Sequence, residues 1–117
     1  MTEITHIDPN ARMSAAVVHG NVAYLAGQVA LGAPGGSVTE QAKDIIERLE
    51  ATLAKAGTDK SKLLSASIWL SDISTFDEMN AVWDAWVKDV TAPARATVES
   101  KLAAPQFTVE IALIAAI

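Results

Sequence analysis

The apolar positions of the first thirty residues fall into three short stretches typical of β-strands. These predicted strands are residues 4–7, 15–19 and 22–26. Gly20 and Asn21 separate the last two, and such a pair is typical of a tight turn between antiparallel strands. Glycines and a proline then mark residues 32–36 as a loop.

Apolar positions in the next segment recur every three or four residues, which is the period of an amphipathic helix. They are Ala42, Ile45, Ile46, Leu49, Leu53 and Ala56. Ser37 and Glu40 have the spacing of a capping box, in which each side chain binds a free backbone amide of the other residue. Gly57 suits the position after a helix end, where φ is positive. A first helix is therefore predicted between Ser37 and Gly57.

In the second half of the chain, a strand pattern is again followed by the three-to-four-residue period of a helix. Residues 63–70 are a predicted strand, and its unbroken apolar run at 68–70 is typical of strands covered on both faces. Ser74 is predicted to cap a second helix, with Asp77 at N3, and Pro93 prevents further helix. Its apolar face consists of Phe76, Met79, Val82, Trp83, Trp86 and Val87. The last two strands are predicted near residues 95–100 and 107–115.

This order, β-β-β-α-β-α-β-β, predicts a single domain over residues 1–117 with helices packed on a mixed sheet. If both helices lie on one face, the other face needs a cover that one chain does not supply. Half of the residues are apolar and the mean hydropathy is +0.25, which also favours a subunit interface. Oligomerisation through sheet faces is the expected solution.

The composition excludes several classes of function. The chain has no cysteine, and therefore no disulfide, thiolate nucleophile or cysteine-ligated zinc. Its net charge is −5 and its basic residues are scattered, so we expect no nucleic-acid partner. The N-terminus lacks the regions of a signal peptide, and no apolar run approaches the ~20 residues of a membrane span. We expect a cytoplasmic protein that binds no membrane.

Few residues suggest a metal or nucleotide site. His6 and His19 are not part of a ligand pattern, and His19 adjoins a turn, so no metal is expected. The glycines at 35–36 lack the lysine and spacing of a phosphate loop. Tryptophans at positions 69, 83 and 86 are expected to pack in the core or an interface rather than line a ligand pocket.

Asn80, Arg95 and Glu110 are the candidate functional side chains. Asn80 is either a solvated amide at the edge of a helical apolar stripe or part of a site. A guanidinium offers a rigid fork that matches a carboxylate. A carboxyl group in an apolar strand suits general acid or base work when desolvation brings its pKa near neutrality. Arg95 and Glu110 form either a salt bridge across a hairpin turning near residues 102–103 or a functional pair.

Several segments together carry a family resemblance. Those around Asn80, Arg95 and Glu110 read FDEMNAVWDAW, PARATV and TVEIALIAAI. Upstream lie YLAGQVA, EQAKDIIERLEATLAKAG and SKLLSASIWLSDISTF. Over nearly its whole length the chain resembles a divergent branch of the reactive-intermediate deaminase family, known as RidA or YjgF and formerly as endoribonuclease L-PSP.

The resemblance implies an α+β fold of the chorismate-mutase type, with two helices on one face of a mixed sheet. It implies a homotrimer with ligand clefts between subunits. In this fold the last two strands need not be neighbours in the sheet. The implied activity is hydrolysis of enamine or imine intermediates, such as 2-aminoacrylate, to 2-keto acids and ammonia. No cofactor is required, because the imine is already electrophilic.

The resemblance also assigns roles to single residues. Arg95 would bind the substrate carboxylate with help from the backbone amide of Thr97, and Glu110 would activate water. Gly27 would let the backbone approach the ligand, and Asn80 belongs to the same site. The alternative is a non-catalytic binder of small carboxylates such as 2-keto acids. The acidic charge disfavours the older labels of ribonuclease and translation inhibitor.

Four positions depart from the family pattern. Archetypal members have a small hydroxyl residue in place of Ala26, an aromatic residue in place of Met13, and often a cysteine in place of Thr97. Ala112 replaces a second acid. The departures predict a more apolar pocket around the substrate-binding positions Met13 and Ala26, and leave the physiological substrate open.

Overall fold

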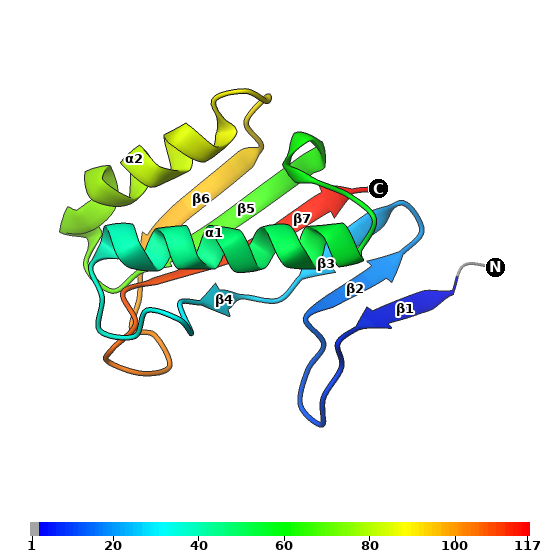
Figure 1. The fold of residues 1–117 in the computed structure, drawn as a ribbon, viewed down its shortest axis with the longest axis horizontal. Helices are drawn as coiled ribbons and strands as arrows, with labels where there is room; N and C mark the ends of the chain where they lie inside the picture. The colour runs from blue at the N-terminus through cyan, green and yellow to red at the C-terminus, as the bar shows by residue number, and fades with distance from the viewer. Residues whose placement is uncertain (1–2) are drawn as a thin grey trace.

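The strands form one mixed seven-stranded sheet in the computed structural model, which describes residues 3–117 (Figure 1). They are β1 (Ile4–Ile7), β2 (Ala16–His19), β3 (Val22–Leu25), β4 (Gln28–Val29), β5 (Leu63–Leu70), β6 (Ala94–Glu99) and β7 (Val109–Ala116). The order across the sheet is β1-β2-β3-β7-β5-β6, and β4 also pairs with β7. Only β5 and β6 are parallel among these pairs. The short β4 was not predicted, because two residues are too few to show a period.

Two helices, α1 (Val38–Lys55) and α2 (Phe76–Val87), cover one face of the sheet (Figure 1). The capping box of α1 is present: the Ser37 amide donates to Glu40 Oε1 at 3.0 Å, and the Glu40 amide donates to Ser37 Oγ at 3.1 Å. Gly57 follows the helix with a φ of +83°. The predicted first helix and the α+β arrangement with both helices on one face are confirmed.

The predicted cap of α2 is wrong. Ser74 lies in a 3₁₀ turn, Ile73–Thr75, and Thr75 is the N-cap of α2 without a side-chain cap bond. Asp72 accounts for the difference, because its carboxylate accepts both the amide and the hydroxyl of Ser74, at 2.9 and 2.7 Å. The Asp72 carboxylate is a stronger acceptor than the Ser74 hydroxyl, and it caps the 3₁₀ turn that precedes α2. The helix therefore begins at Phe76, two residues after Ser74, and Asp77 lies at N2.

Alternate strand residues form the core beneath the helices. In β7, Val109, Ile111, Leu113 and Ala115 are at most 1% exposed. They pack with buried residues of α1, including Ile45, Leu49 and Leu53. The intervening residues of β7 point to the other face and are only half-buried.

The sheet face without helices is apolar and open. Tyr24 and Val98 are each 48% exposed, and Trp69 and Ile114 are half-buried on the same face. Trp69 therefore lacks the second cover that the apolar run at 68–70 predicted, because both helices pack against the opposite face. This open face is the surface for which the sequence predicted a second subunit.

Candidate functional site

Arg95 lies on the edge strand β6 and points to the helix-covered side of the sheet. Its register partner on β5 is Ala66, which is 1% exposed beneath the helices. Arg95 Nη1 donates to Asn80 Oδ1 of α2 at 2.8 Å. The guanidinium carbon is 5.7 Å from the centroid of the Phe76 ring and 5.6 Å from that of Trp83. One hydrogen bond and two cation–π contacts therefore fix the guanidinium in place.

The charge of Arg95 is not paired with a carboxylate within residues 3–117. The ion pairs there are Arg48–Asp44, Lys55–Asp8 and Lys60–Asp89. Asn80 is neutral and uses only one of the five guanidinium donors. Arg95 thus keeps both its charge and most of its donors for an anion.

Thr97 lies two residues beyond Arg95 on the same face of β6. Its hydroxyl is buried and has no hydrogen-bond partner among the described residues. An unpaired buried hydroxyl costs free energy, so this group can accept or donate a further bond near Arg95. We call Arg95, Asn80, Thr97, Phe76 and Trp83 the arginine half.

Glu110 lies on β7, opposite Trp69 of β5 and Val29 of β4, and points to the open face. Gly27, between β3 and β4, lies directly against its carboxylate: a Cβ built on Gly27 would be 2.2 Å from Glu110 Oε2. A side chain at position 27 would displace the flexible carboxylate from this place, so glycine permits the close approach.

Gly27 also lines a cavity of about 320 Å³ together with Met13 and Ala26. The structure thus gathers three predicted site residues around one hollow, which Leu25 and Leu49 place on the helix-covered side of the sheet. Glu110 does not line this hollow. We call Glu110, Gly27, Ala26 and Met13 the glutamate half.

The two halves lie on opposite faces of the sheet in one chain. β5 separates β6 from β7, so Arg95 and Glu110 are not partners in a hairpin. Arg95 shares the helix-covered face with Ala66, whereas Glu110 shares the open face with Trp69. The salt-bridge alternative is wrong, and a single chain does not bring the two charges together.

Metal ligands and membrane spans can be judged from residues 3–117. No three His, Cys, Asp or Glu side chains lie close enough there to hold a metal ion, and both histidines are exposed. Neither helix of this part of the chain has the length and apolar character to cross a membrane.

A family model described as endoribonuclease L-PSP matches residues 3–117. The chain belongs to the endoribonuclease L-PSP family. A RutC family protein of Haemophilus influenzae is 44% identical over 112 residues, covering 96% of this chain and 97% of the relative. The RutC family protein YoaB of Escherichia coli K12 is 40% identical, covering 97% of this chain and 98% of the relative.

Solved structures agree with this fold. A crystal structure of a YjgF family member from Neisseria meningitidis superposes with a TM-score of 0.93 at 38% identity, covering 97% of this chain and 94% of the other. The structure of yeast Mmf1, at 22% identity, shares the fold with a TM-score of 0.87. The family resemblance read from the sequence is therefore confirmed.

Two members of the arginine half were not predicted for this L-PSP chain. Phe76 and Trp83 were assigned to packing, yet both rings contact the Arg95 guanidinium. Their spacing carried a usable signal, because Phe76, Asn80 and Trp83 follow the i, i+4, i+7 pattern of one helix face.

Proposed function

We propose that this chain hydrolyses reactive enamine and imine intermediates, such as 2-aminoacrylate, to 2-keto acids and ammonia. The observation that carries the proposal is the state of Arg95. Its guanidinium is held by Asn80 and two aromatic rings but is paired with no carboxylate among residues 3–117. A cation immobilised in this way is prepared to bind a small carboxylate.

Arg95 anchors the substrate carboxylate with its free guanidinium donors. Thr97 adds its backbone amide, since β6 is an edge strand and alternate amides of such a strand have no partner strand. The anchor fixes the imine carbon relative to the water that attacks it, and such positioning lowers the barrier.

Glu110 transfers the protons. An enamine first tautomerises to its imine, whose carbon is electrophilic. Glu110 takes a proton from water as the oxygen bonds to that carbon, and gives the proton to nitrogen, which forms a carbinolamine. It then takes the hydroxyl proton and returns it to nitrogen as the C–N bond breaks, which leaves a 2-keto acid and ammonia.

The proposal requires two chains for each site. The arginine half and the glutamate half are separated by the sheet in one chain. In the proposed homotrimer a neighbouring chain covers Tyr24, Trp69 and Val98, and the edge position of β6 lets Arg95 of one chain meet Glu110 of the next. No cofactor, metal or nucleic acid takes part in this reaction.

A non-catalytic binder of 2-keto acids is the second candidate. The arginine half favours it, because this half is complete within one chain and needs no acid to hold a carboxylate. Ala112, where a second acid is expected in the family, also weakens the case for proton transfer.

Pyruvate release separates the two candidates. A serine dehydratase generates 2-aminoacrylate in situ, and the rate of pyruvate appearance is followed with and without this protein. Wild type should accelerate release, and Arg95→Ala should abolish both the acceleration and the binding of 2-oxobutyrate. The matched control is Lys62→Ala. It removes an exposed charge that belongs to neither half, and it should behave as wild type. Binding of 2-oxobutyrate without acceleration of any imine would establish the binder instead.

A further inference from the structure

We infer that Gln41 is a positioning residue that holds the Glu110 carboxylate in place, although it belongs to neither half of the site. The inference rests on the proposed function, because it takes Glu110 as the group that transfers protons. Gln41 lies on α1, and its side chain is bonded to the backbone immediately before β7, the strand that carries Glu110. A buried side chain outside the site thus sets where the acid lies.

The Gln41 side chain is fully buried and makes three hydrogen bonds. It is 0% exposed. Nε2 donates to the carbonyls of Gly36 and Gln106 at 3.0 and 2.8 Å, and Oε1 accepts the amide of Thr108 at 2.8 Å. Both N–H donors of the side chain are used, and its oxygen is an acceptor. An apolar side chain at this position would leave three backbone groups without this partner.

These bonds hold the segment directly before the first residue of β7. The Gln106 carbonyl also accepts the Gly35 amide at 2.9 Å, and the Thr108 carbonyl accepts the Ser71 amide at 3.1 Å. The segment is thus held near the N-terminus of α1 on one side and by the residue that follows β5 on the other. Glu110 follows Thr108 by two residues, about 7 Å along an extended chain. A shift of Thr108 therefore reaches Glu110 through a single intervening residue.

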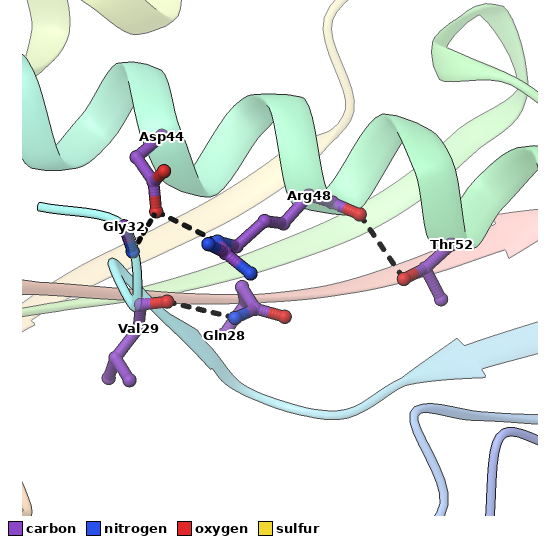
Figure 2. Close-up of polar contacts among 6 residues, drawn as sticks. All are labelled: Gln28, Val29, Gly32, Asp44, Arg48 and Thr52. Atoms are coloured by element: carbon purple, nitrogen blue, oxygen red, sulfur yellow. Dashed lines mark hydrogen bonds and ion pairs between the residues drawn. The ribbon is translucent and has the colours of Figure 1, made fainter.

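The helix that carries Gln41 is itself fixed beside Glu110. One turn further along α1, the Asp44 carboxylate accepts the Gly32 amide at 3.2 Å and forms an ion pair with Arg48 at 2.9 Å (Figure 2). Gly32 lies three residues after β4, and β4 pairs with β7 at Glu110. Helix α1 therefore supports Glu110 along two paths, one through the loop after β4 and one through Gln41.

Thr58 is bonded to the opposite end of β7. Gln41 and Thr58 are the least exposed polar residues among residues 3–117. The Thr58 hydroxyl donates to the carbonyl of Ala116, the last residue of β7, at 2.6 Å. Ala116 is six residues from Glu110, about 20 Å along the strand. Loss of the Thr58 hydroxyl should therefore destabilise the domain without moving the Glu110 carboxylate.

Gln41→Met tests the inference, because methionine has a similar length but no N–H donor and only a weak acceptor. The start of β7 loses its bond to α1, while the pairing of β7 with β5 keeps the strand in the sheet. Since misplacement by about 1 Å costs on the order of a hundredfold in rate, a smaller shift of Glu110 should lower kcat for 2-aminoacrylate about tenfold. The Kd for 2-oxobutyrate should stay at the wild-type value, because the arginine half contains no residue of β7.

Thr58→Val is the matched control, since it removes a buried hydrogen bond from the far end of the same strand. It should keep the wild-type kcat, and urea unfolding measures the stability that each variant loses. A wild-type kcat in a folded Gln41→Met protein would overturn the inference, and so would an equal loss of kcat in Thr58→Val.

Gln41→Asn decides the matter if Gln41→Met does not fold. Asparagine keeps the amide but is one methylene shorter, so it cannot reach all three partners at once. Its kcat should fall while its Kd for 2-oxobutyrate stays unchanged. A wild-type kcat in Gln41→Asn would overturn the inference.

Carbon-13 NMR distinguishes failure of the inference from failure of the proposed function. The carboxyl resonance of Glu110, assigned by its absence in Glu110→Gln, should move in the folded Gln41 variant and stay in place in Thr58→Val. If wild type hydrolyses no imine but the resonance behaves in this way, the deaminase proposal fails and the positioning by Gln41 stands. If wild type hydrolyses 2-aminoacrylate but neither kcat nor the resonance responds to substitution of Gln41, the inference fails and the proposed function stands.

Discussion

The arginine half and the glutamate half solve the problem of a charge in an apolar domain in different ways. Arg95 is fixed within one chain, by an amide at 2.8 Å and by two aromatic rings. The Glu110 carboxylate lies where a Cβ of residue 27 would be, so its position is compatible with glycine there. The arginine half is therefore fixed within a single chain, whereas Glu110 lies on the open apolar face that the proposed homotrimer would cover.

The largest effect is expected for Glu110→Gln. The amide keeps the size of the side chain but cannot shuttle protons, so kcat should fall about a hundredfold to ten-thousandfold. Affinity for 2-oxobutyrate should change little, because the arginine half is untouched. Single-turnover rates and calorimetry measure the two quantities. Normal hydrolysis by this variant would refute the role of the carboxylate.

A smaller loss of kcat is expected for Gly27→Ala. The new Cβ would overlap Glu110 Oε2, so the carboxylate has to move. A displacement of about 1 Å at a reacting group costs on the order of a hundredfold in rate, and the flexible glutamate side chain should recover part of it. The rate should therefore fall about tenfold to a hundredfold. Wild-type kcat in this variant would show that the contact does not position Glu110.

Asn80→Ala tests the other half with a milder change. Loss of one hydrogen bond to the guanidinium should weaken 2-oxobutyrate binding about fivefold, or about 1 kcal/mol, with kcat nearly constant. Asp84→Ala, an exposed position on the same helix, is the matched control and should bind as wild type. A fall in kcat with unchanged affinity would contradict the division of labour between the halves.

The smallest effect concerns stability outside both halves. The backbone amide and hydroxyl of Ser37 lower the pKa of Glu40 from its ordinary value of 4.5. A lowered folded pKa means that this carboxylate stabilises the fold above pH 4.5, and that the contribution disappears as the pH falls through the folded value. Urea unfolding from pH 7 to pH 3 should show Glu40→Gln less stable than wild type at neutral pH, with the difference vanishing in acid. A difference independent of pH would contradict the capping-box assignment.

The sequence predicted the elements whose signals are local. α1 was predicted because its period and both ends are encoded within neighbouring residues, from Ser37 to Gly57. The start of α2 was mispredicted because two possible caps, Asp72 and Ser74, compete, and only the folded backbone shows which is used. Strand bounds agreed to within two residues, apart from the two-residue β4.

The residues of the candidate site were predicted from the sequence, but their relative positions in the fold were not. The placement of β5 between β6 and β7 is a long-range choice, so the sequence alone left the hairpin salt bridge open. Contacts of Phe76 and Trp83 with Arg95 likewise depend on how α2 packs on the edge strand. The family resemblance supplied Gly27 and favoured the site interpretation of Asn80 over that of a solvated amide.

Complementation between two inactive variants tests the central claim, that the site combines Arg95 of one chain with Glu110 of another. Arg95→Ala and Glu110→Gln chains, differently tagged, are unfolded together, refolded at equal concentrations, and purified as mixed oligomers. Each mixed trimer should have one site of three with both wild-type residues, and thus about a third of wild-type activity. Each variant treated alone should remain inactive. Mixed oligomers that form but regain no activity would place both residues of each site in the same chain and contradict the account.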